Sequence, residues 1–180
     1  MKKNLTYPVI FCLFVILFSA CVKDTDFDQA NDIMPTPVVE LDLIYFNLEA
    51  SDFFDTDTST PILTVRDTTD LRFLNDGISD NLIRAEFYFK FTNSIPREFN
   101  VLFEFLGDTN DTTYVTQTLV NEGTTQIPTI TEFIHNVEGE SLERLTQASK
   151  VVVSVTIPSS NANLEGDLNL QSKTTYFLEF

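Results

Sequence analysis

The amino-acid sequence predicts an all-β fold, an antiparallel β-sandwich of about eight strands with one short crossover helix. Two segments, residues 82–92 and 99–106, alternate apolar and polar residues with the period of two that half-buried strands show. Stretches rich in Asp, Asn, Thr and Ser separate the apolar segments at the spacing of short strands. Two packed sheets are expected, because a single sheet would leave one apolar face in water.

The first expected strand covers residues 38–48. Its apolar residues stand at odd positions up to Leu43 and at even positions from Ile44 onward. Such a shift predicts a β-bulge or a strand that is buried on both faces. A turn-rich stretch at residues 52–61 follows, and a second strand is expected at residues 61–67.

The segments 82–92 and 99–106 carry the clearest strand signal. The first should point inward with Ile83, Ala85, Phe87, Phe89 and Phe91. Its outward side chains should be Arg84, Glu86, Tyr88, Lys90 and Thr92. The second should point inward with Phe99, Val101, Phe103 and Phe105. Pro96 lies between the two segments and ends the hydrogen-bond ladder, so each segment is a separate strand.

Four further strands complete the expected fold, at residues 113–120, 125–134, 150–158 and 174–180. Only residues 139–149 have a helical pattern, because Leu142, Leu145 and Ala148 recur at three-residue steps and Glu143 stands in the first turn. This helix should cross between strands and cover one end of the core.

The last eleven residues, LQSKTTYFLEF, place Leu170, Thr174 and Tyr176 at a characteristic spacing. The pattern resembles the leucine, threonine and tyrosine before strand F of fibronectin type III domains, where the tyrosine hydroxyl caps a turn. This resemblance implies an Ig-like sandwich and no particular function.

The N-terminus has the layout of an export signal. Lys2 and Lys3 precede an apolar run, Val9–Phe18, that is too short to span a bilayer as a helix. Ser19 and Ala20 then precede Cys21. The stretch resembles the lipobox of bacterial lipoproteins, which implies that residues 1–20 are a signal peptide and that Cys21 becomes the lipidated first residue. A secretory signal followed by a chance cysteine is the alternative.

Residues 21–37 should form the lipidated cysteine and an acidic, extended tether that spans at most about 55 Å. Lys23, Asp24 and Asp26 resemble the acidic export signal of surface lipoproteins of the Bacteroidota, and a plain solvated linker is the alternative. The folded domain is then expected at residues 38–180. The expected location is the outer membrane, lipid-anchored, facing either the cell surface or the periplasm.

Composition limits the partners. The chain has 27 acidic and 11 basic residues and a net charge of −16, with the acids spread along its length. This balance argues against binding to nucleic acid, which needs a basic surface. Removal of residues 1–20 also removes Cys12, which leaves Cys21 as the one cysteine and permits no internal disulfide.

The sequence predicts no catalytic site and no cofactor. His135 is the only histidine and is expected at the rim of the fold, since no nucleophile motif accompanies it. Two acidic stretches offer weak calcium candidates. These are Asp52, Asp55 and Asp57 in the first and Asp108 and Asp111 in the second. The same residue types are the usual turn formers, and the turn interpretation is favoured.

Ligand-binding residues are hard to single out, because tryptophan is absent and the phenylalanines alternate into the core. Tyr88 and Tyr114 are the weak candidates for contact with a sugar. We expect a non-catalytic accessory or binding module whose partner is another envelope protein or a surface glycan, with contacts made by loops at the sandwich ends. A pilus or adhesin subunit and a carbohydrate-binding or hydrolytic lipoprotein remain the alternatives.

Overall fold

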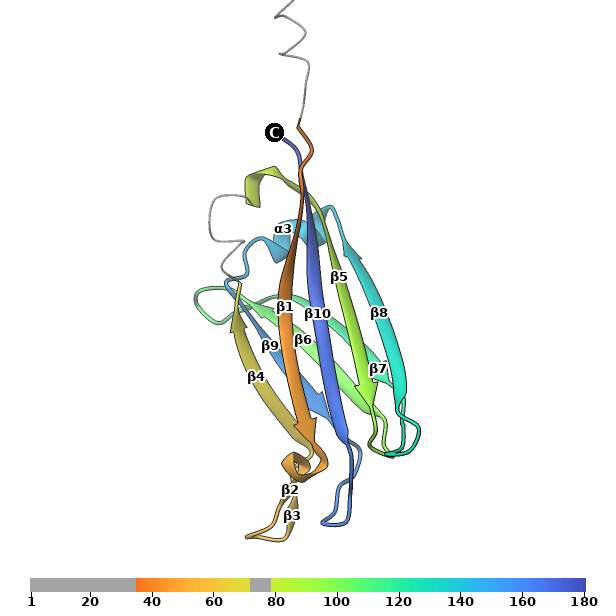
Figure 1. The fold of residues 1–180 in the computed structure, drawn as a ribbon. Helices are drawn as coiled ribbons and strands as arrows, with labels where there is room; N and C mark the ends of the chain where they lie inside the picture. The colour runs from red at the N-terminus through yellow and green to blue at the C-terminus, as the bar shows by residue number, and fades with distance from the viewer. Residues whose placement is uncertain (1–34, 72–78) are drawn as a thin grey trace, which may run out of the picture. The chain divides into compact units, whose positions relative to one another are not determined.

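The computed structural model describes residues 35–71 and 79–180, which form an antiparallel β-sandwich (Figure 1). Eight long strands make two four-stranded sheets. The front sheet consists, in spatial order, of β1 (Val38–Glu49), β10 (Asp167–Leu178), β5 (Leu82–Asn93) and β8 (Thr129–Val137). The back sheet consists of β4 (Thr64–Asp70), β9 (Lys150–Thr156), β6 (Phe99–Leu106) and β7 (Thr112–Val120).

The other elements are short. Two single turns of 3-10 helix, η2 (Ala50–Phe53) and η3 (Ser79–Asn81), precede β2 and β5. A two-stranded ribbon joins β2 (Phe54–Asp55) to β3 (Thr60–Pro61). The helix α3 (Glu140–Leu145) carries the chain from the front sheet to the back sheet. The predicted all-β sandwich with eight main strands and one crossover helix is confirmed. No helix among the described residues is long and apolar enough to cross a bilayer.

Strand pairing is nested along the chain. The first long strand, β1, pairs with the last, β10, and the next inward pairs are β4 with β9 and β5 with β8. Among the eight long strands of the described residues, the innermost pair, β6 and β7, is the only one that consecutive strands form. Eight strands that are paired in this way and rolled into two sheets have jelly-roll order. Immunoglobulin domains distribute seven strands differently, so the strand order replaces the Ig-like detail of the prediction.

The core lies between the two sheets and is rich in phenylalanine. Phe87 and Phe89 of β5 face Phe105 and Phe103 of β6, with ring centroids 5.3 and 4.2 Å apart. All four side chains are fully buried, as predicted. Burial of each such side chain contributes about 1.5–3 kcal/mol. The two strands belong to opposite sheets, so the loop around the exposed Pro96 passes from the front sheet to the back sheet rather than closing a hairpin.

The expected inward position of Ile83 is wrong. Its side chain is 48% exposed, and Leu82 occupies the core position instead. The cause is a register shift against β10, where Phe177 pairs with Arg84 and Leu178 pairs with Leu82. From Ala85 onward the predicted inward set is correct.

The C-terminal strand is longer than predicted and contains no corner. It begins at Asp167 rather than at residue 174, and Leu170, Thr174 and Tyr176 all lie within it and point inward. Tyr176 stands within the strand and not beside a turn, so the corner of the fibronectin pattern is not present at this position. Burial raises the pKa of Tyr176 to about 12.

Two other strands begin later than expected. The segments predicted at residues 61–67 and 125–134 are strands at Thr64–Asp70 and Thr129–Val137. In the second case Pro128 precedes the strand, because a proline cannot donate to the ladder. At the other end of the fold, the carbonyls of Pro35 and Pro37 accept hydrogen bonds from the N–H groups of Phe180 and Leu178. These bonds extend the pairing of β1 with β10.

Candidate functional site

The outer face of the front sheet, which we call the front face, gathers polar and aromatic side chains. Strand alternation points every second residue of β1, β10, β5 and β8 toward water. Cross-strand register then places these side chains in rows. One row contains Tyr45, Gln171, Lys90 and Glu132, and the next contains Asn47, Asn169, Thr92 and Ile130.

The β1 bulge shapes one edge of this face. Asp42 pairs with Lys173 and Tyr45 pairs with Gln171, so Leu43 and Ile44 stand together opposite Ser172. The Ser172 hydroxyl accepts a hydrogen bond from the Ile44 N–H (2.9 Å) and donates one to the Ile44 carbonyl (2.7 Å). The predicted bulge is therefore present, and a buried serine replaces the interrupted ladder.

A hollow of about 420 Å³ opens at the bulge. Its lining residues are Asp42, Leu43, Ile44, Tyr45, Gln171 and Ser172. Tyr45 is 68% exposed, and its hydroxyl accepts a hydrogen bond of 3.3 Å from Nδ2 of Asn169. Within residues 35–71 and 79–180, the side chains of Asp42 and Gln171 have no hydrogen-bond or ion-pair partner. The hollow thus combines an exposed ring with unused polar groups.

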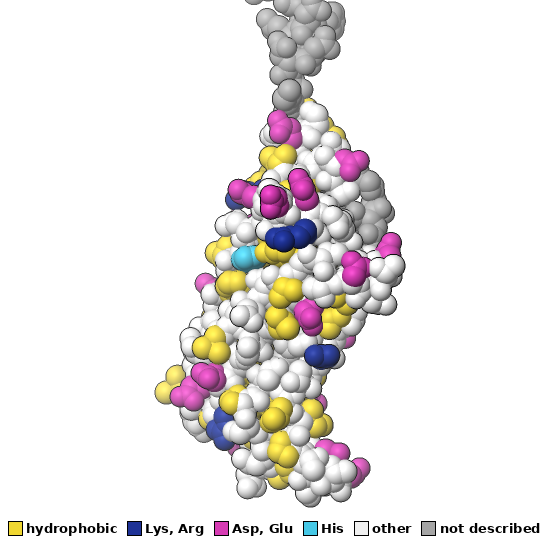
Figure 2. Space-filling model, turned by 180° about the vertical axis from the view of Figure 1, so that it is seen from behind, with side chains coloured by type: hydrophobic (Ala, Val, Ile, Leu, Met, Phe, Trp, Pro, Cys, Tyr) yellow, Lys and Arg dark blue, Asp and Glu magenta, His cyan; other side chains and the backbone are white. Residues whose placement is uncertain are grey.

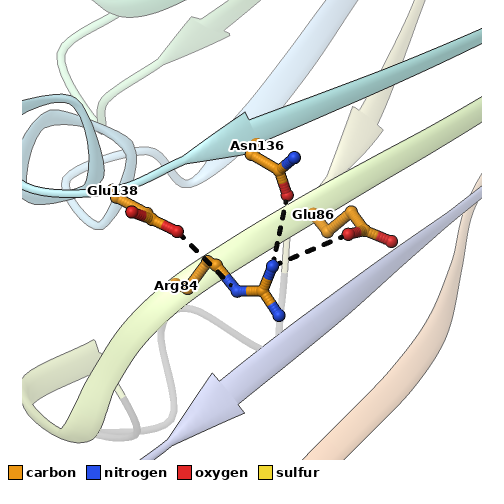
Figure 3. A network of polar contacts seen from close by, with 4 residues as sticks. All are labelled: Arg84, Glu86, Asn136 and Glu138. Carbon is orange, nitrogen blue, oxygen red and sulfur yellow. Dashed lines mark hydrogen bonds and ion pairs between the residues drawn. The ribbon is translucent and has the colours of Figure 1, made fainter.

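At the end of the front face near the C-terminus, Arg84 is held on several sides (Figure 3). Its Nη1 lies 3.5 Å from Oδ1 of Asn136 and 3.8 Å from Oε2 of Glu86, and its Nε lies 3.8 Å from Oε1 of Glu138. The guanidinium carbon also lies 3.6 Å from the ring centroid of Phe177. Such partly exposed ion pairs add little stability, but they leave Arg84 little freedom to bind a ligand.

The middle of the front face is partly occupied by its own contacts. The Tyr88 hydroxyl donates to Oε1 of Glu132 at 2.8 Å, and this hydrogen bond raises the pKa of Tyr88. Lys173 forms an ion pair with Glu40, with 2.7 Å between Nζ and Oε2. Lys90, beside Glu132 in the register, has no ion-pair partner among the described residues. Tyr88 therefore belongs to the candidate site by its position, although its hydroxyl is engaged.

Tyr114 lies elsewhere and does not share a site with Tyr88. It stands on β7, where its hydroxyl forms a hydrogen bond with Nε2 of His135 on β8 and so joins the two sheets at one edge. The His135 ring stacks on the Phe133 ring, with 5.7 Å between the ring centroids. Burial lowers the pKa of His135.

The acidic stretches form turns. In the β2–β3 ribbon, one carboxylate oxygen of Asp55 accepts from the N–H groups of Asp57 and Thr58, and the other accepts from the Thr58 hydroxyl. The Thr58 hydroxyl bond is the main reason that the pKa of Asp55 is lowered. Asp52 accepts from the Glu49 N–H.

The second acidic stretch repeats this pattern. Asp111 accepts from the Thr109 hydroxyl, which lowers the pKa of Asp111. The nearby Asp108 is exposed. Among the described residues, no three His, Cys, Asp or Glu side chains are grouped as a metal would require. The carboxylates of Asp55 and Asp111 thus serve their own turns.

Tyr45 was missed by sequence reasoning, although its signal was present. The shift of apolar positions after Leu43 predicts the bulge, and a residue that follows the shifted Ile44 must point outward. The predicted Cys21, Lys23, Asp24 and Asp26 lie outside the described residues.

The opposite side of the sandwich also carries exposed apolar side chains. Exposed hydrophobic side chains there lie in small groups among uncharged ones, with the acidic residues scattered (Figure 2). Exposed apolar residues on the back sheet include Val115 and Leu119. Single exposed apolar side chains of this kind are normal on soluble proteins and need no partner.

No protein-family model and no curated protein matches the chain. Among solved structures, it is similar to VP2 of infectious bursal disease virus, with 11% identity over 79% of this chain and 32% of that chain and a TM-score of 0.48. It is also similar to a candidate secreted protein from Parabacteroides distasonis, with 13% identity over 63% of this chain and 37% of that chain and a TM-score of 0.47. The chain thus spans about a third of the length of these structures. Likeness at this level assigns no function.

Proposed function

We propose that this protein is a lipid-anchored, non-catalytic binding module of the outer membrane, and that its front face contacts an envelope protein or a surface glycan. The observation that carries the proposal is the front face itself. It combines an open hollow, the exposed ring of Tyr45 and the unpaired Lys90 on a chain that is otherwise acidic. Ligand sites are typically concave, with a few polar groups that fix the ligand's orientation.

The anchor in this proposal rests on the N-terminal sequence, where Ser19 and Ala20 precede Cys21. Several acyl chains on one cysteine hold a protein firmly in a bilayer, whereas a single chain binds only marginally. Acidic residues come after Cys21. They are appropriate for a tether, because like charges repel each other and keep the segment extended.

The side chains that sequence reasoning considered for catalysis are engaged in structural contacts. The imidazole of His135 forms a hydrogen bond with Tyr114, and no serine, threonine or cysteine of the described residues forms a hydrogen bond with it. The carboxylates of Asp55 and Asp111 accept hydrogen bonds within their own turns. These hydrogen bonds give each of the three groups a structural role, and this supports a non-catalytic function.

The test is a pull-down from solubilised envelopes with the mature chain, made soluble by Cys21→Ser. The front-face variant Tyr45→Ala/Lys90→Glu is compared with the back-sheet variant Leu119→Ala, which changes a side chain that is 53% exposed. We expect the same envelope component to be retained by wild type and Leu119→Ala and lost by the front-face variant.

Two results would overturn the proposal. One is retention by the front-face variant together with loss by Leu119→Ala. The other is turnover of a glycan or peptide panel by the wild-type chain. Size-exclusion chromatography of the same material tests the pilus alternative, because self-assembly into rods would favour it.

A further inference from the structure

The hollow at the β1 bulge is a formed feature of the fold rather than a gap in it. Ser172 is buried, and its hydroxyl satisfies both backbone groups of Ile44, the residue at which the ladder is interrupted. The bulge keeps Ile44 in the core while Asp42 and Tyr45 point outward on either side of it. Because these two backbone groups of Ile44 have a partner within the protein, the bulge needs no ligand to satisfy them, and the hollow is preorganised.

The side chains around the hollow are suited to bind a ring that carries several hydroxyl groups. Tyr45 presents a flat, electron-rich ring face, to which the C–H groups of a sugar are attracted. The Asp42 carboxylate can only accept hydrogen bonds, and the Gln171 amide can both donate and accept, which together match a pair of hydroxyl groups. Both side chains lack partners among the described residues.

Asn169 fixes the orientation of the Tyr45 ring. Its Nδ2 lies 3.3 Å from the Tyr45 hydroxyl, 3.3 Å from the Phe46 carbonyl and 3.5 Å from Oδ1 of Asn47. A ring that is held before the ligand arrives loses less conformational freedom on binding.

Local charge favours a neutral ligand. The negative Asp42 lies on one side of the hollow. On the other side lies the positive Lys90, the cross-strand neighbour of Gln171, so the two side chains carry opposite charges. An anionic ligand would meet Asp42 directly in a chain of net charge −16. A metal ion would find a single carboxylate, which is too few hard ligands.

A second hollow, of about 440 Å³, continues the site along β1. Its lining includes Asn47, Glu49 and Ser51 together with Glu165. Asn47 is two residues beyond Tyr45, or about 7 Å along a strand. A chain of linked rings lying along β1 would reach both hollows.

Resting on the proposed function and narrowing its ligand, we infer that the two hollows along β1 bind a neutral oligosaccharide, with one ring stacked on Tyr45. Asp42 and Gln171 hydrogen-bond the hydroxyl groups of that ring, and Asn47 meets the next part of the ligand.

The test uses the mature Cys21→Ser chain labelled with ¹⁵N and titrated with neutral gluco-, manno-, galacto-, xylo- and N-acetylgluco-oligosaccharides at millimolar concentration. We expect one of these series to shift the backbone amides of residues 42–47 and 169–172. Tyr45→Ala should weaken its binding about tenfold or more, whereas Tyr45→Phe should keep most of the affinity because the ring remains. Gln171→Ala should also weaken binding.

The matched control is Ile134→Ala, a 58% exposed side chain on the same face at the far edge, which should leave affinity unchanged. Melting temperatures of all variants check that each is folded. The inference is overturned if no series shifts these amides, or if binding survives both Tyr45→Ala and Gln171→Ala. A front-face envelope partner found without oligosaccharide binding would leave the proposed function standing and refute this ligand.

Discussion

Phe89 and Lys90 are neighbours in the chain but occupy opposite environments. The Phe89 ring is fully buried, with the Phe103 centroid at 4.2 Å and the Phe133 centroid at 5.9 Å. Lys90 points to the front face and has no ion-pair partner among residues 35–71 and 79–180. The period of two in the sequence predicted both environments, because adjacent side chains on a strand point to opposite faces.

This difference has a measurable consequence for stability. Phe89→Ala should lower the free energy of unfolding by about 3–5 kcal/mol, since it leaves a cavity between the two sheets. Lys90→Ala should change it by no more than about 0.5 kcal/mol. Urea unfolding of the mature Cys21→Ser chain measures both, and equal midpoint shifts would show that the strand register is wrong.

His135 should make stability depend on pH. Burial lowers its pKa in the folded chain below the ordinary 6.5, so the unfolded chain binds the extra proton first as the pH falls. The contribution of His135 to the free energy of unfolding is therefore largest above about pH 7. It decreases as the pH falls below the pKa of His135 in the unfolded chain, and it stops changing once the pH is below its pKa in the folded chain. Urea midpoints measured from about pH 8 to about pH 5.5 should fall for this reason, before most carboxylates titrate.

The control for this pH effect is His135→Gln, which retains a hydrogen-bonding side chain for Tyr114 but does not titrate in this range. Its midpoint should vary less over the same interval. An unchanged pH slope in His135→Gln would assign the effect to other groups.

Asp55 tests the interpretation of the acidic stretches as turns. Its carboxylate oxygens already accept three hydrogen bonds within the β2–β3 ribbon. Added calcium should therefore not raise the melting temperature, which it would do by mass action if it bound the folded state. Differential scanning fluorimetry at millimolar calcium is sufficient. A rise that Asp55→Asn abolishes would establish a calcium site.

At the scale of the element, the β1 bulge connects the sequence pattern to the candidate site. The shift of apolar positions between Leu43 and Ile44 predicted either a bulge or a strand buried on both faces. The structure selects the bulge, and Ser172 on the neighbouring strand makes it possible. That partner is 128 residues away from Ile44 and could not be identified from local pattern.

The bulge should depend on this one hydroxyl. Ser172→Ala leaves the buried N–H and C=O of Ile44 without their partner, and we expect a loss of about 1–3 kcal/mol in the free energy of unfolding. Thr175→Ala, an outward-pointing change on the same strand, should cost no more than about 0.5 kcal/mol. Urea titrations of the two variants compare them directly, and equal small effects would mean that water replaces the serine.

Element ends were harder to predict than element interiors. Ile83 stands at an inward position in the alternation of the sequence, yet a register shift opposite Phe177 and Leu178 turns it outward. The shift belongs to the pairing of two strands that lie far apart in the sequence, so the alternation within one strand does not report it.

At the scale of the whole molecule, nested pairing explains why the strands could be found but not ordered. Each long strand has one partner at the mirror position in the chain, from β1 with β10 to β6 with β7, and the pairs β10–β5 and β9–β6 complete the two sheets. Alternation says which face of a strand is buried, but it does not say which other strand lies beside it. Pairing over such distances is decided by how all the faces close one core together.

The proposed anchor is also a property of the whole molecule. In the native host, metabolic labelling with a palmitate analogue should mark the wild-type protein and not Cys21→Ser, because only a cysteine at that position could receive the acyl chains. The unlabelled variant should leave the membrane fraction as well. Equal labelling of both proteins would refute lipidation at Cys21.

The sequence alone was sufficient for the fold class, the phenylalanine core and the crossover helix, and it offered the bulge as one of two interpretations of the first strand. These features follow from local periodicity and residue type, which act over a few neighbouring residues. Only the tertiary structure decided the jelly-roll order, the separation of Tyr88 from Tyr114 and the hollow at Tyr45, Asp42 and Gln171. These depend on which distant strands pair and in which register, and that choice is made by the packing of the whole core rather than by any one segment.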